Sequence, residues 1–156
     1  MTDLSDFART AAADHGLCVV STLRADGTIQ ASVVNGGVIE DPLTGAPVVA
    51  FVAHAGTHKL NNLRARPTVT IVARAGLAWT AVEGTAVLCG PHDRLAGVDD
   101  ERLRLLLREI FTAAGGVHDD WATYDRVLAD EGRTAVLIEA RRVHHDTGVE
   151  PERPQG

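Results

Sequence analysis

The stretch LCVVSTLRADGTIQASVVNGGVI, residues 17–39, decides the fold. Two apolar runs rich in β-branched residues flank the tetrapeptide Ala-Asp-Gly-Thr at 25–28. An Asp-Gly pair between two such runs favours a tight hairpin with positive φ at its centre. The sequence therefore predicts an antiparallel pair of strands over 17–24 and 28–39.

Four further strands follow the same pattern. Each is a short apolar or β-branched run, and turn residues such as Pro and Gly separate it from its neighbours. These runs cover residues 48–54, 68–75, 79–90 and 134–145. Six strands in hairpin order favour a small antiparallel barrel or sandwich over a parallel α/β sheet.

Helical patterns frame the strands. Apolar residues recur at three- and four-residue spacing over 4–15, 99–114 and 119–132, and acids open the last two segments. A chain of 156 residues is long enough for one domain with a real core. We therefore predict a single domain over 1–147, followed by a flexible tail over 148–156.

Composition and charge disfavour several classes of protein. The net charge of −6 argues against binding to nucleic acid. The apolar runs are shorter than the roughly 20 residues that cross a bilayer, and the N-terminus carries acids where a secretory signal carries bases. A cytoplasmic protein without a membrane partner is expected. In that compartment Cys18 and Cys89, both in apolar strands, are expected to be buried thiols.

Standard catalytic motifs are absent from the sequence. It contains no GxGxxG after a strand, no GxxxxGK[ST], no HExxH and no GxSxG. These absences disfavour a Rossmann dinucleotide site and a P-loop. His54 and His58 are four residues apart, but no third ligand lies nearby in the sequence, so no metal site is predicted.

One basic segment interrupts this acidic chain. From Pro42 to Val82 there is no Asp or Glu, yet the segment holds Lys59, the only lysine of the protein, and three arginines. Such a segment suits a small anionic ligand. Exclusion of acids from buried strands explains the pattern equally well.

The lysine falls at a predicted helix start. Thr57 is a good N-cap for a helix over 58–65, and Pro67 ends that helix. Lys59 would lie in the first turn, where a cation alone costs about 0.3–1 kcal/mol. A phosphate held by the free N–H groups, the Thr57 hydroxyl and the Lys59 ammonium would offset this cost. The alternative is a solvated surface lysine.

Three stretches in order resemble one protein family. They are STLRADGTIQASVV at 21–34, a longer stretch at 49–73 that contains K-x-x-N-L-R-x-x-P, and WTAVEGTAVL at 79–88. This set resembles the flavin and deazaflavin split-barrel oxidoreductases related to pyridoxamine 5'-phosphate oxidase, and looks most like the branch that uses coenzyme F420. The resemblance covers about residues 5–146. It implies a mainly β fold, a six-stranded antiparallel split β-barrel of Greek-key type with flanking helices.

The resemblance also implies which residues contact the cofactor ring. In similar proteins the strand matching residues 30–34 lies along the ring system. Ser32, Val33 and Val34 would then offer backbone and hydroxyl contacts. Trp79 would cover the cofactor from the neighbouring strand.

The phosphate of the cofactor would lie at the helix start. By resemblance it is held by Thr57, His58 and Lys59, with Asn62 on the next helical turn. Family members are homodimers with the cofactor at the subunit interface, so the same assembly is expected here.

The implied activity is hydride transfer from reduced F420 to an electron-poor double bond of a small molecule. The cofactor does this chemistry and the protein orients it, so the catalytic residue stays unassigned. One alternative is an FMN-binding oxidoreductase like pyridoxamine 5'-phosphate oxidase. Another is a non-catalytic protein that carries F420 or a flavin.

Overall fold

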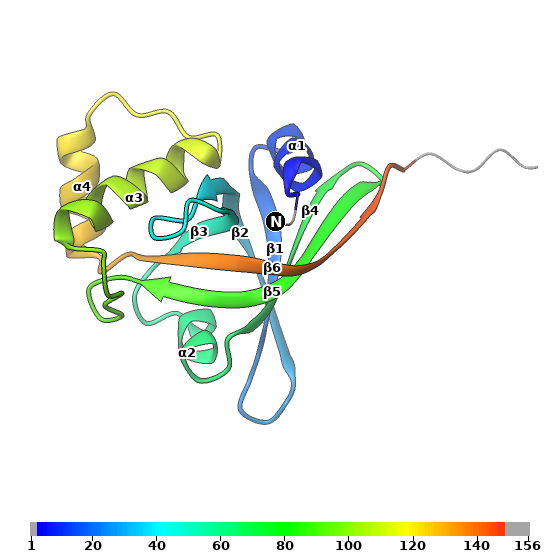
Figure 1. The fold of residues 1–156 in the computed structure, drawn as a ribbon, viewed down its shortest axis with the longest axis horizontal. Helices are drawn as coiled ribbons and strands as arrows, with labels where there is room; N and C mark the ends of the chain where they lie inside the picture. The colour runs from blue at the N-terminus through cyan, green and yellow to red at the C-terminus, as the bar shows by residue number, and fades with distance from the viewer. Residues whose placement is uncertain (1–2, 149–156) are drawn as a thin grey trace, which may run out of the picture.

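The computed structural model describes residues 3–148, and its six strands close into one antiparallel barrel (Figure 1). Around the barrel the strand order is β1-β2-β3-β6-β5-β4. The strands are β1 Leu17–Leu23, β2 Ile29–Glu40, β3 Pro47–Ala53, β4 Thr68–Ala75, β5 Ala78–Cys89 and β6 Thr134–Asp146. The six-stranded antiparallel barrel implied by the family resemblance is confirmed. The tail predicted over 148–156 lies, after its first residue, outside the described residues.

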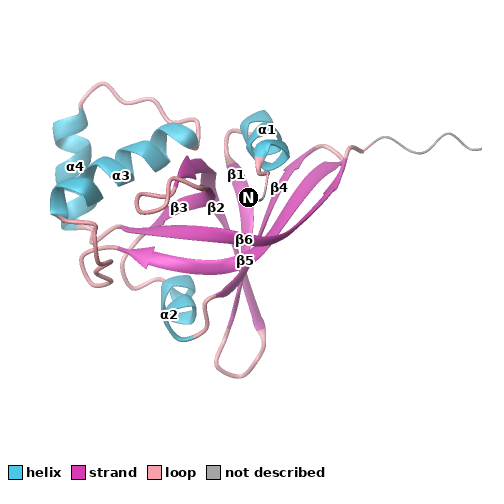
Figure 2. Cartoon of the chain, viewed as in Figure 1, coloured by secondary structure: helices cyan, strands magenta, loops and turns pink. Residues whose placement is uncertain are grey.

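Helices flank the barrel on several sides (Figure 2). The described residues form α1 Ser5–Ala13, α2 His58–Ala65, α3 Asp100–Ala113 and α4 Trp121–Asp130. Helix α1 packs against β2, β4 and β5, α2 against β1 and β5, and α3 against β2, β3 and β6. None of these helices has the length and apolar character needed to cross a bilayer.

The first hairpin turns at Gly27, as the Asp-Gly pair predicts. Gly27 has a φ of +83°, and its N–H donates to the Arg24 carbonyl at 3.0 Å. The Arg24 N–H in turn donates to the Thr28 carbonyl at 2.8 Å. Asp26 keeps a negative φ, so the loop has three residues and a single left-handed glycine.

Two apolar cores hold the fold together. The first fills the barrel and includes Phe51 and Ile71, both fully buried. The second lies outside the barrel, where Leu106 and Ile110 of α3 cover Ala50 and neighbouring residues of β3. Strand β3 is therefore buried on both faces, which explains its nearly unbroken apolar sequence.

The two cysteines are buried thiols, as predicted. Cys18 belongs to the barrel core and Cys89 to the outer core, and neither forms a disulfide. Burial raises the pKa of Cys18 to about 11 and also raises that of Cys89. Both side chains act as small apolar core residues.

Helix α3 ends directly against the backbone of β2. A Cβ placed on Gly37 would lie 2.5 Å from the carbonyl oxygen of Ala113, closer than atoms pack in proteins. The missing side chain at Gly37 thus lets the end of α3 rest on the strand. This contact places the end of α3 beside the second half of β2.

Candidate functional site

Strand β2 has an open edge over its first half. Its residues 29–35 pair with β1, but its pairing with β3 begins only at Gly36 opposite Phe51. Within residues 3–148, the other edge of 29–35 therefore faces no strand. Backbone N–H and C=O groups on such an edge are free to bind a ligand.

Ser32, Val33 and Val34, the predicted ring contacts, all lie on this open stretch. Val33 points outward and is 65% exposed, whereas Val34 packs against the barrel core. Ser32 lies opposite the buried Val20, so its hydroxyl faces the same side as Val34. The Ser32 hydroxyl is buried and has no hydrogen-bond partner among the described residues.

The predicted helix start is present at Thr57. Thr57 has the extended backbone of an N-cap residue, with φ −68° and ψ 149°, and α2 begins at His58 as expected. The hydroxyl, however, makes no capping hydrogen bond, which corrects the capping role predicted from the sequence. Its oxygen is buried and lacks a partner within the described part of the chain. A buried hydroxyl left unpaired costs about 1–3 kcal/mol, so a ligand that bonds to it gains affinity.

Among the four Lys and Arg side chains of the acid-free segment, only Lys59 lacks a partner within residues 3–148. Arg64 pairs with Asp93 at 2.7 and 2.8 Å, Arg66 donates to the Leu23 carbonyl, and Arg74 donates to the Gly76 carbonyl. Lys59 makes no ion pair or side-chain hydrogen bond with any residue from 3 to 148. It is half-buried, and burial alone lowers its pKa.

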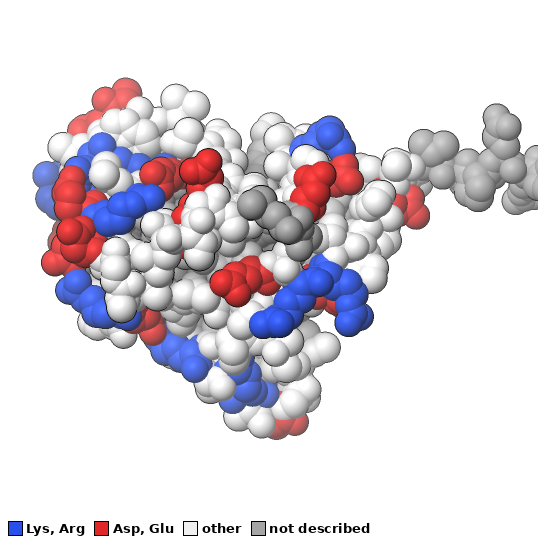
Figure 3. Space-filling view, in the orientation of Figure 1, with Lys and Arg blue, Asp and Glu red and all other residues white. Residues whose placement is uncertain are grey.

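Basic side chains gather around this helix in the space-filling view. Figure 3 shows Lys and Arg side chains along the lower edge of the molecule, where α2 lies. At the α3–α4 end, by contrast, acids and bases alternate closely. The surface around α2 is therefore one part of this face that suits an anion.

Asn62 has a different neighbourhood from the other predicted phosphate contacts. It is buried, and its side-chain amide donates to the Thr22 hydroxyl at 3.0 Å. That hydroxyl donates to the Gln30 side chain at 3.1 Å. The chain of hydrogen bonds ties α2 to β1 and to the open half of β2, so Asn62 positions the helix against the strands.

The two histidines near α2 are both exposed. His58 opens the helix beside Lys59, and a ring nitrogen of His54 lies 3.0 Å from the Ala55 carbonyl. His, Cys, Asp and Glu side chains form no cluster of three anywhere in residues 3–148.

Trp79 lies away from the other predicted contacts. It is on β5, opposite Arg74 of β4 and Asp146 of β6, and is 37% exposed. In either direction around the barrel, two strands separate β5 from β2. Within one chain β5 is therefore not adjacent to β2 in the sheet, and the covering of the ring by Trp79 stays a prediction.

Exposed apolar side chains lie on the outer face of β1 and β2, and one more lies on β5. Val19 of β1 lies directly opposite Val33 of β2, and both side chains are at least 44% exposed. Leu17 and Trp79 add exposed apolar surface on β1 and β5. A patch of this kind is typical of a surface that another molecule covers.

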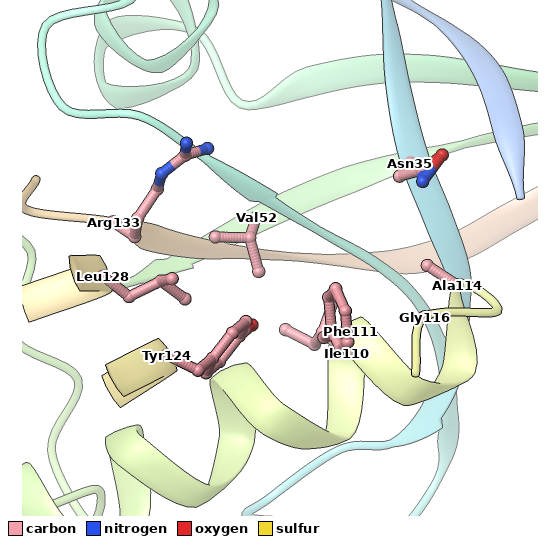
Figure 4. A pocket seen from close by; sticks show the side chains of 9 residues that line it. All are labelled: Asn35, Val52, Ile110, Phe111, Ala114, Gly116, Tyr124, Leu128 and Arg133. Carbon is pink, nitrogen blue, oxygen red and sulfur yellow. The ribbon is translucent and has the colours of Figure 1, made fainter. Parts of the chain in front are cut away.

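A cavity of about 300 Å³ opens between β2, β3 and the α3–α4 helices (Figure 4). Its apolar walls include Val52, Phe111, Tyr124 and Leu128. Asn35 and Arg133 add polar groups at opposite ends of the opening. The sequence did not predict this site, because its lining comes from segments far apart in the chain.

No family model matches the chain, and no curated protein sequence matches it. Solved structures do share its fold. A conserved hypothetical protein of Mycobacterium tuberculosis aligns with a TM-score of 0.68 and 18% identity, over 100% of this chain and 93% of its own. A pyridoxamine 5'-phosphate oxidase-related, FMN-binding protein of Nostoc punctiforme gives 0.64 and 13%, over 93% and 84%. An F420 reductase gives 0.53 and 16%, over 82% and 88%.

Proposed function

We propose that this chain is a coenzyme F420-dependent oxidoreductase that reduces an unsaturated small molecule. Lys59 carries the proposal. It is a half-buried ammonium without an intramolecular partner in residues 3–148, and it lies in the first helical turn after the unpaired hydroxyl of Thr57. Such an arrangement is costly in isolation and favourable once a phosphate is bound. The resemblance to F420-using proteins and the shared fold of an F420 reductase support the choice of anion.

Two groups of residues, one at the start of α2 and one along β2, suit the two ends of such a cofactor. The Lys59 ammonium, the Thr57 hydroxyl and the first N–H groups of α2 would hold the phosphate. The backbone groups of residues 29–35 would orient the ring system along the open edge of β2. Val33 would give the ring an apolar contact.

When bound, reduced F420 supplies a hydride from its central ring. The chain contributes orientation, charge compensation and an apolar surrounding. Asn62 ties α2 to β1 through its hydrogen bond to Thr22, and the Thr22 hydroxyl extends this link to Gln30 of β2. The ammonium of Lys59 would neutralise the phosphate and so hold that end of the cofactor by charge. The ring at the other end would be oriented by its fit against β2.

Titration of the purified full chain with F420 and, separately, with FMN tests this proposal. Binding of F420 at least ten-fold tighter than FMN is expected, followed by single-turnover loss of the reduced-cofactor absorbance with an electron-poor alkene. Preference for FMN, with rapid reoxidation in air, would instead support an FMN-dependent oxidoreductase. Tight F420 binding without turnover across a panel of enones would support a carrier protein.

We also propose that two copies associate through the outer face of β2, β1, β4 and β5. Exposed Val19, Val33 and Trp79 support this assembly, because large apolar side chains rarely stay uncovered on one face. In a homodimer Trp79 of the partner subunit would be free to approach a cofactor on β2. Light scattering should then give twice the mass of the chain.

Replacing Trp79 with alanine should weaken cofactor binding about three-fold and change the fluorescence of the bound cofactor. The expected cause is loss of an aromatic contact worth roughly 0.5–1.5 kcal/mol. Fluorescence titration measures both effects. Leu77→Ala is the matched control, because Leu77 is an 81% exposed apolar residue of the same β4–β5 hairpin. Identical titrations of the two variants would exclude Trp79 from the site.

A further inference from the structure

We propose that the cavity between β2, β3 and the α3–α4 helices holds the substrate, and that this substrate is a planar, mainly apolar molecule with one anionic group. The inference rests on the proposed function for the identity of the neighbouring cofactor site. The cavity itself, its lining and its charge are independent of that function.

The cavity adjoins the open edge of β2. Asn35, which borders it, is two residues after Val33, so the two side chains lie on the same outer face of the strand. Pairing between β2 and β3 begins one residue later, at Gly36. A molecule in the cavity would therefore lie next to a ring held along residues 29–35, where a hydride donor and acceptor must meet.

The walls of the cavity suit a flat apolar body. Phe111 and Tyr124 have ring centroids 5.0 Å apart and are tilted by 52°, and Val52 and Leu128 line the same space (Figure 4). A volume of about 300 Å³ is at the small end of ligand pockets. It accommodates a molecule of two or three fused rings and is too small to enclose a tetrapyrrole.

Helix α4 gives the cavity a fixed wall. The Tyr124 hydroxyl donates to the Leu107 carbonyl at 3.1 Å, and Asp125 pairs with both Arg104 and Arg108. These interactions hold α4 to α3 next to Tyr124, which lines the cavity. A preformed pocket loses less entropy on binding than one that must assemble.

Arg133 supplies the positive charge that would bind the anionic group of the ligand. Its Nε donates to the Glu131 carboxylate at 2.8 Å, while its two Nη groups make no hydrogen bond to any residue between 3 and 148. Figure 4 shows the guanidinium at one end of the opening, turned toward the end of β3. Among residues 3–148 no Asp or Glu lines the cavity itself, and the Glu131 carboxylate occupies only the Nε side of the guanidinium. The free side of the guanidinium fork therefore suits a carboxylate of the ligand, bound through two parallel hydrogen bonds.

The probe pair 2-naphthoate and 2-naphthamide tests the cavity without cofactor. The two molecules share a planar two-ring body and differ in charge. Calorimetry on the full chain should show naphthoate binding more tightly than naphthamide, with backbone amide NMR shifts concentrated at Asn35, Phe111 and Gly116. Shifts confined to other surfaces, or equal binding of both probes, would overturn the proposal.

Arg133→Gln should weaken naphthoate binding about three- to ten-fold and leave naphthamide binding unchanged, because a partly exposed ion pair is screened by water. Arg126→Gln removes the same charge from an exposed position on α4 outside the cavity and should change neither. If both variants weaken naphthoate equally, the charge acts at long range and Arg133 is not a ligand contact.

A second measurement separates this inference from the proposed function. With F420 bound, saturating naphthoate should alter the cofactor fluorescence, since the two molecules would be adjacent. Naphthoate binding to a chain that binds neither F420 nor FMN would overturn the substrate assignment together with the proposed function. F420 binding without any naphthoate or naphthamide binding would leave the function standing and remove the cavity from it.

Discussion

Lys59→Gln should weaken F420 binding by roughly ten-fold or more, because a hydrogen bond to a charged group contributes about 1.5–3 kcal/mol. The ammonium has no partner within residues 3–148, so its removal breaks no contact of the folded chain. Thermal unfolding should therefore stay unchanged while the dissociation constant rises. Fluorescence titration and a circular dichroism melt measure the two quantities.

The pH dependence of F420 binding is a second measurement that distinguishes the natural chain from Lys59→Gln. Burial lowers the pKa of Lys59, and the protonated form is the one that attracts a phosphate. Affinity should fall as the pH rises toward that lowered pKa in the natural chain, and this fall should be absent from Lys59→Gln. Arg126→Gln controls for net charge. An unchanged dissociation constant in Lys59→Gln would exclude Lys59 from the site.

Gly37→Val should lower the free energy of unfolding by about 3 kcal/mol, because overpacking at a rigid contact costs 1–3 kcal/mol and a backbone carbonyl cannot move aside cheaply. A Cβ at Gly37 would meet the Ala113 carbonyl carbon at 2.6 Å as well as its oxygen. The end of α3 would have to shift. For a domain of this size we expect a melting temperature lower by about 6–12 °C.

Ala31→Val is the matched control for this change. Ala31 is an exposed residue of the same strand, where a branched side chain fits without displacing backbone. Equal melting temperatures for the two variants would show that α3 tolerates displacement at Gly37. Because the end of α3 also lines the cavity, Gly37→Val should weaken 2-naphthoate binding as well.

The strands and helices could be predicted because their signals are local. Each signal depends on a few adjacent residues. The hairpin is marked by an Asp-Gly pair, α2 by Thr57 before it and Pro67 after it, and α3 and α4 by the acids at their starts. Asp99 and Asp120 indeed accept hydrogen bonds from the first turns of α3 and α4. The hydroxyl of Thr57 shows the limit of this reasoning, since the residue type indicates a cap position but not whether the cap bond forms.

Features that depend on three-dimensional pairing could not be predicted in the same way. Closure of the barrel brings β1 next to β4, and no pattern in either strand specifies that partner. The same closure places two strands between Trp79 and β2. Arg133 could not be predicted as a ligand contact from the sequence, because it lines one cavity with Asn35 and Phe111, which are distant from it in the chain.

The unpaired lysine has a practical consequence for chemical labelling. Lys59 is the only side-chain amine of the protein, so an acylating reagent can modify the chain there and at its α-amino group. Burial lowers the pKa of Lys59, which enlarges the reactive neutral fraction at a given pH. Mass spectrometry of the peptide that contains Lys59 would then show, even in a crude cell extract, whether a bound ligand protects the start of α2 from acylation.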